Sequence, residues 1–94
     1  MSRKRVAVES GLLNKGFRRR EGDHHYYIYH TLKGKKTAVF TKTSHSHTDI
    51  STDLMSKMSK QCKLIKKDFE SLVDCPLSQI DYEQKLLAGQ HIAP

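Results

Sequence analysis

The chain has 94 residues, 36% of them hydrophobic, and its 17 lysines and arginines exceed its 10 acidic residues by seven. This length suits one domain with a small core. No stretch approaches the roughly 18 apolar residues that a membrane span requires, and the run after the basic N-terminus is too short for a signal peptide. The sequence therefore favours one cytoplasmic domain over residues 1–94, without a membrane partner.

The first expected element is a helix over residues 3–15. Its apolar side would be formed by Val6, Leu12 and Leu13. The short run of valines at its start fits a strand equally well. Gly11 lies inside this helix, where a glycine costs about 1 kcal/mol relative to alanine.

Three strands are expected next, over residues 17–21, 24–32 and 37–43, with hairpin-length turns between them. The middle run is rich in aromatic and β-branched residues, which favours a strand. Alternation places Tyr26 and Ile28 on one face and Tyr27 and Tyr29 on the other. Tyr26 and Ile28 are favoured as core residues, although the pattern leaves open which face is inward.

Beyond residue 49 the pattern becomes helical. Ser51 or Thr52 suits the N-cap of a first helix, Pro76 ends a second, and Ser78 with Asp81 resembles a capping box at the start of a third. The expected inward positions are Leu54, Met55, Met58, Cys62, Ile65, Phe69, Leu72, Val73, Tyr82, Leu86 and Leu87. This order predicts an α+β domain with its helices on one face of a three-stranded antiparallel sheet.

The positive charge is concentrated in the first half of the chain. Residues 1–50 contain 11 basic and 4 acidic residues, whereas residues 51–94 contain 6 of each. A one-sided basic field favours a polyanionic partner, and phosphate backbones are the commonest polyanions in a cytosol. Nucleic acid is therefore favoured over a surface that is merely basic. The densest basic blocks are Arg18, Arg19 and Arg20, and Lys33, Lys35 and Lys36.

Five of the six histidines lie between residues 24 and 47, and three interpretations compete for them. A histidine can remove a proton from an RNA 2′-OH or protonate a leaving oxygen near neutral pH. His45 and His47 form a pair at a spacing that occurs in metal sites, but no thiolate or carboxylate motif completes it, so neither metal nor cofactor is expected. The third interpretation, and the commonest one for any single histidine, is that of a polar residue on an exposed sheet face or in a loop. His24, at a turn-to-strand junction between basic blocks, is the best candidate for acid/base chemistry.

Several motifs follow one another along residues 12–45. In residues 12–17 a helix ends in Gly-Phe, and in residues 18–26 a strand leads to the Gly-x-His of Gly22-Asp23-His24. A basic turn then precedes a third strand at residues 37–40, and Ser44-His45 comes after that strand. In this order the motifs resemble the HicA-type (YcfA-like) mRNA interferase toxins, many of which have a histidine after the third strand. Asp23 departs from the family, which usually has serine there. The resemblance covers residues from about 5 to 73.

The resemblance implies a double-stranded-RNA-binding-like α-β-β-β-α fold over about residues 3–73, with residues 74–94 as an additional helical extension. It implies metal-independent mRNA cleavage, with His24 as the catalytic histidine and Gly22 as the turn residue before it. It also implies a HicB-like antitoxin as protein partner.

The leading hypothesis is therefore a toxin-type mRNA endonuclease in which His24 acts as general base or acid. The expected RNA contacts are Arg18, Arg19, Arg20, Lys33, Lys35, Lys36, His25 and His45. A non-catalytic RNA- or DNA-binding module that uses the same basic sheet is the alternative. A third hypothesis is a protein-interaction subunit whose aromatic strand recruits an acidic partner.

Overall fold

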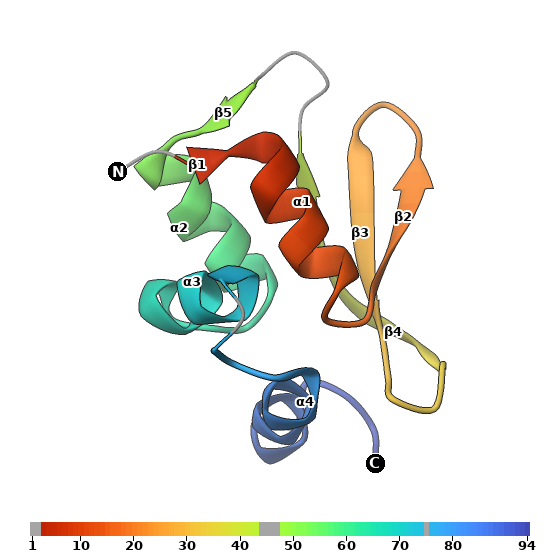
Figure 1. Ribbon diagram of the computed structural model, residues 1–94. Coiled ribbons are helices and arrows are strands. Elements are labelled where there is room, and N and C mark those ends of the chain that lie inside the picture. Colours follow the sequence, from red (N-terminus) through yellow and green to blue (C-terminus); the bar gives the residue numbers. More distant parts are fainter. Residues whose placement is uncertain (1–2, 44–47, 75) are drawn as a thin grey trace.

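The structure is a computed structural model that describes residues 3–43, 48–74 and 76–94. Figure 1 shows a three-stranded sheet with helices packed on one side of it. The expected α+β class and the antiparallel sheet are confirmed, and the described residues form four helices. In chain order the elements are β1 (Arg3–Lys4), α1 (Arg5–Leu13), β2 (Phe17–Glu21), β3 (His25–His30), β4 (Lys36–Thr43), β5 (Asp49–Ile50), α2 (Thr52–Gln61), α3 (Lys66–Asp74) and α4 (Gln79–Ala88).

The sheet has the strand order β2-β3-β4, so the aromatic strand β3 is central and both of its edges are paired. A separate two-residue pairing joins β1 to β5, with Arg3 opposite Ile50. The sequence did not predict this pairing, because a two-residue strand is too short to show an alternating pattern.

The two faces of β3 are the reverse of the expected arrangement. Tyr27 and Tyr29 are fully buried under the helices, whereas Tyr26 and Ile28 are only partly buried and lie on the opposite face. The preference for Tyr26 and Ile28 as core residues was therefore wrong. Buried tyrosines contribute large apolar rings and need a polar partner for each hydroxyl. The helix side provides both, because the Tyr29 ring lies 5.1 Å from that of Tyr82 and its hydroxyl donates to Glu83 at 2.7 Å.

Helix α1 buries a different side than expected. Val8 and Leu12 are completely buried, whereas Val6 and Leu13 are 65% and 46% exposed, so their expected core positions were wrong. Val8 and Leu12 are four residues apart and lie on one side of the helix. Val6 and Leu13 are rotated away from that side, and the strand alternative for this segment is not adopted.

Gly11 permits a close approach between α1 and α3. A Cβ atom at this position would lie 2.5 Å from the backbone oxygen of Val73 in α3, which is shorter than any ordinary contact. The glycine that is unfavourable for an isolated helix is therefore required by the packing of two helices.

Lys15 is buried and ties the end of α1 to the end of α3. Its Nζ atom donates to the carbonyl oxygens of Leu72 at 2.8 Å and Leu77 at 2.7 Å. The last carbonyls of a helix lack partners within the helix and carry a partial negative charge, which a lysine ammonium group satisfies. One of the basic residues of the first half thus has a structural role.

The C-terminal helices begin where their caps predict. The hydroxyls of Ser51 and Ser78 accept hydrogen bonds from the backbone nitrogens three residues further on, at 3.2 and 3.1 Å. Seven of the eleven expected inward residues are buried, whereas Leu54, Val73 and Leu87 are only partly buried and Ile65 is 66% exposed. No helix in the described part of the chain is long and apolar enough to cross a membrane.

Replacing Gly11 by alanine should lower the free energy of unfolding by about 1–3 kcal/mol, because overpacking separates α1 from α3. Helix propensity alone predicts the opposite sign, a gain of about 1 kcal/mol. Urea denaturation measures the difference, with Ser10→Ala on the exposed side of the same helix as a control that should stay within about 0.5 kcal/mol of the wild type. A Gly11→Ala protein as stable as wild type would contradict the close packing.

Candidate nucleic-acid interface

The face of the sheet that points away from the helices, here called the open face, carries basic and aromatic side chains in register. Arg18 lies opposite Ile28, which in turn lies opposite Phe40. Two residues further along each strand, Arg20 lies opposite Tyr26, which lies opposite Lys42. Because side chains two apart on a strand share a face, these cross-strand rows lie side by side.

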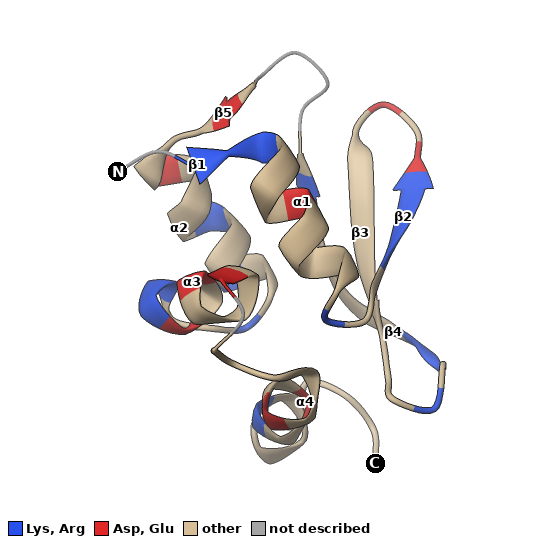
Figure 2. Cartoon of the chain, viewed as in Figure 1, with Lys and Arg blue, Asp and Glu red and all other residues tan. Residues whose placement is uncertain are grey.

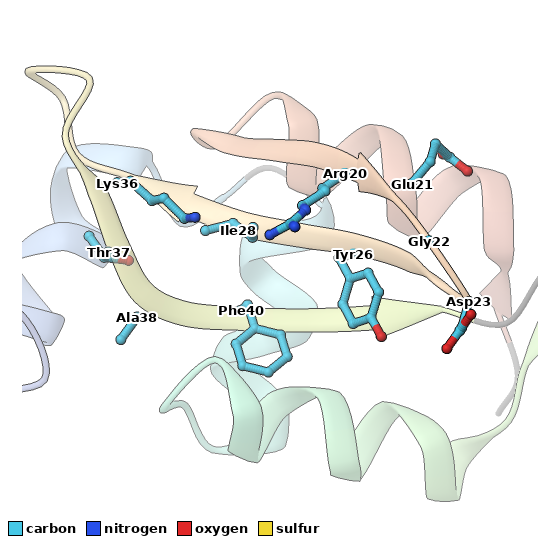
Figure 3. Close-up of a pocket in the computed structure, with 10 residues that line it drawn as sticks. All are labelled: Arg20, Glu21, Gly22, Asp23, Tyr26, Ile28, Lys36, Thr37, Ala38 and Phe40. Carbon is cyan, nitrogen blue, oxygen red and sulfur yellow. The ribbon is translucent and has the colours of Figure 1, made fainter.

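A groove of about 700 Å³ runs over this face (Figure 3). The Tyr26 and Phe40 rings lie 6.3 Å apart and are tilted by 53°, and Phe40 is 45% exposed. Apolar side chains thus form part of its floor, whereas Arg20 and Lys36 border it. The lining residues are Arg20, Glu21, Gly22, Asp23, Tyr26, Ile28, Lys36, Thr37, Ala38 and Phe40.

The fold divides the eleven basic residues of the first half into two groups. Four of them, Arg3, Lys4, Arg5 and Arg19, pair with carboxylates, and Lys15 binds backbone carbonyls. The other six form no ion pair with any residue that the structure describes, and they lie on β2, on β4 or in the β3–β4 turn (Figure 2). They are Arg18, Arg20, Lys33, Lys35, Lys36 and Lys42.

Arg19 differs from its two neighbours because it points to the helix side. Its Nε atom donates to the Tyr27 hydroxyl at 3.0 Å, and its Nη2 atom lies 3.5 Å from the buried carboxylate of Glu9. Thr43 donates to the same carboxylate at 2.6 Å. The hydrogen bond with Tyr27 raises the pKa of Arg19 above its ordinary value, and the nearby carboxylates act in the same direction. This guanidinium is therefore used to compensate a buried charge.

His24 lies in the β2–β3 turn at one end of the open face. Its ring is 6.1 Å from that of Tyr26 and meets it edge-on at 89°. Gly22 and Asp23, which precede it in the turn, line the groove. His24 therefore lies beside the groove and next to its aromatic floor, half-buried rather than fully exposed.

His25 lies on the other side of the sheet. Its Nδ1 atom is 2.9 Å from Oε1 of Glu21, and its register partner on β4 is Thr43, which is buried. The structure therefore separates the two adjacent histidines, and only His24 adjoins the groove. His45 lies outside the described residues.

Phe40 and Lys42 belong to the open face but were not among the expected contacts. The alternation of residues 37–43 carried the signal, since Ala38, Phe40 and Lys42 share one face of that strand. Of the expected basic contacts, Arg18 and Arg20 lie on the open face, Lys36 borders the groove, and Lys33 and Lys35 lie in the adjoining turn.

Among the residues that the structure describes, no three histidine, cysteine, aspartate or glutamate side chains are placed to hold a metal ion. Comparisons of the chain with protein-family models, with curated proteins and with solved structures found no match. The chemistry of the open face is therefore the basis for a functional assignment.

Proposed function

We propose that the protein binds single-stranded RNA along the open face of its sheet. The observation that carries this proposal is the grouping of six basic side chains without described ion-pair partners around a groove with an aromatic floor. Five other basic residues of the same half pair with carboxylates or carbonyl oxygens of the protein itself. The clustering of the remaining six is therefore a property of the fold rather than of composition.

Each part of the open face matches a part of a nucleic-acid strand. Lysine and arginine neutralise backbone phosphates and release condensed counterions. Exposed aromatic rings stack on unpaired bases, and each stacked base contributes roughly 1–3 kcal/mol. Tyr26 and Phe40 are accessible from the groove, and stacking on them requires bases that are not already inside a duplex. This favours a single strand over a double helix.

RNA is preferred to DNA because of the family resemblance. Apart from the two-residue strand β5, the elements from α1 to α2 follow the α-β-β-β-α order of the double-stranded-RNA-binding-like fold, which supports membership of the HicA-type toxins as a proposal. On this proposal mRNA in the cytoplasm is the substrate, a HicB-like antitoxin is the partner, and residues 74–94 are an addition to the family fold.

RNA cleavage at His24 is a second candidate function, favoured by the position of this ring beside the groove and against Tyr26. The imidazole would take the proton of a 2′-OH, whose oxygen attacks the adjacent phosphorus. The bond to the 5′-oxygen then breaks, that oxygen takes a proton from water, and a 2′,3′-cyclic phosphate and a 5′-OH result. Arg20, which borders the groove, would stabilise the additional charge on the phosphate in the transition state.

Phe40→Ala should weaken binding of a fluorescently labelled oligouridylate by about 5- to 150-fold, because it removes a stacking surface. Fluorescence anisotropy measures the affinity. Val6→Ala removes an apolar side chain of α1 that is more exposed than Phe40, 65% against 45%, and should leave the affinity unchanged. Equal affinities for Phe40→Ala and Val6→Ala would contradict binding on the open face.

His24→Ala should abolish cleavage of mRNA, and with it any growth inhibition on expression in a bacterium, while RNA affinity is retained. Messenger RNA integrity in the expressing cells is the measurement, and purified protein in EDTA tests whether cleavage is independent of metal. His25→Ala is the matched control, because His25 lies on the other side of the sheet. If wild type binds RNA and leaves it intact, the catalytic function is wrong and the binding module remains.

A further inference from the structure

A second hollow, of about 220 Å³, lies between the β3–β4 turn and the C-terminal tail, residues 89–94. Lys36, Thr37 and Ala38 line both this hollow and the groove, so the two adjoin at the start of β4. The full lining is Thr31, Lys35, Lys36, Thr37, Ala38, His91, Ile92 and Ala93. None of these residues is acidic.

Both walls of the second hollow are fixed to the same helix. In the middle of α4, Glu83 accepts hydrogen bonds from the backbone nitrogen of Leu32 at 2.9 Å and from the Tyr29 hydroxyl at 2.7 Å. Beyond the end of α4, the backbone nitrogen of His91 donates to the Leu86 carbonyl at 2.9 Å, and Ile92 packs against the core. The β3–β4 turn and the tail are therefore held at a set distance from each other.

The tail places the His91 ring in a specific position. Gln90 adopts a left-handed conformation with a φ of 60°, which turns the chain back after α4. The ring then lies over Gly89, where a Cβ atom would be 2.7 Å from both Cδ2 and Nε2 of the imidazole. Glycine at position 89 thus leaves room for the ring beside the hollow.

The opposite wall presents two ammonium groups. The turn is closed by hydrogen bonds from the backbone nitrogens of Gly34 and Lys35 to Thr31, at 2.7 and 3.0 Å. Gly34 takes a φ of +83°, which a glycine adopts without strain. Lys35 and Lys36 follow at once, and neither pairs with a carboxylate among the described residues. The Thr37 hydroxyl donates to the Tyr29 carbonyl at 2.8 Å, whereas the Thr31 hydroxyl only accepts, from the backbone nitrogen of Lys35. Two lysines, the Thr31 hydroxyl and an imidazole therefore remain as donors that suit a phosphate group.

We propose that the second hollow binds a backbone phosphate of the RNA strand that crosses the open face, with Lys35, Lys36 and His91 as its ligands. This inference rests on the proposed RNA binding and extends it to the C-terminal helix and tail. On this account α4 positions the tail at the end of the groove. An RNA strand that is long enough to extend beyond Lys36 then gains an additional contact.

The test is a series of labelled oligouridylates of about 4 to about 16 nucleotides, a range that spans the usual site sizes. Wild type, His91→Ala and Gly89→Ala are compared by anisotropy, with Gln84→Ala on an exposed position of α4 as the matched control. Gly89→Ala keeps the imidazole but forces it out of position, and the φ of −84° at this residue suits alanine. Urea denaturation of each variant establishes that it is folded.

The expected result depends on oligonucleotide length. Both variants should bind the shortest oligomers as wild type does and the longer ones about fivefold more weakly, as for the loss of one polar contact. Affinities unchanged at every length, or reduced equally at every length, would overturn the second hollow while leaving RNA binding on the open face intact. If wild-type protein that is folded binds no oligomer of any length, the proposed function itself fails and this inference fails with it.

Discussion

The alternation of the central strand β3 is the constraint on which the other features depend. Tyr27 and Tyr29 are buried beneath the helices with their hydroxyls hydrogen-bonded, and a shift of one residue would turn both to the solvent. In antiparallel pairing, residues directly opposite each other have their side chains on the same face, so the orientation of β3 fixes that of β2 and β4. Arg18 on β2 and Phe40 on β4 therefore lie on the side away from the helices. The groove is a consequence of where two tyrosines are buried.

The same constraint determines how the positive charge is used. Within the consecutive arginines of β2, Arg19 turns inward to Glu9 and Tyr27, whereas Arg18 and Arg20 turn outward. A buried carboxylate such as that of Glu9 requires a compensating cation, because an unpaired charge in the interior is costly. The net charge of the first half thus overstates the number of unpaired cations, because only six of its eleven basic residues have no partner in ion pairs or buried carbonyls among the described residues.

Much of the fold could be predicted from local patterns, whereas long-range partners could not. The strand at residues 17–21 and the serine caps at 51 and 78 depend on neighbouring residues and are found as expected. The prediction of the inward face of β3 was wrong because both faces carry large side chains. Which face is buried depends on the helices that cover it. Gly11 and His91 are further cases, since the surroundings of the first are set by Val73 and those of the second by the β3–β4 turn.

The central claim is that Arg18 contacts RNA, as proposed, whereas Arg19 is held by Glu9 and Tyr27 on the helix side of the sheet. The slope of log affinity for oligouridylate against log salt concentration tests it most directly in Arg18→Gln and Arg19→Gln. Arg18→Gln should reduce the magnitude of this slope by about 0.7, the value for one lost phosphate contact on a single strand. Arg19→Gln should leave the slope unchanged and lower the free energy of unfolding by about 1 kcal/mol, since its half-exposed contacts are screened by solvent. The account is contradicted if folded Arg19→Gln protein loses as much of the slope as Arg18→Gln.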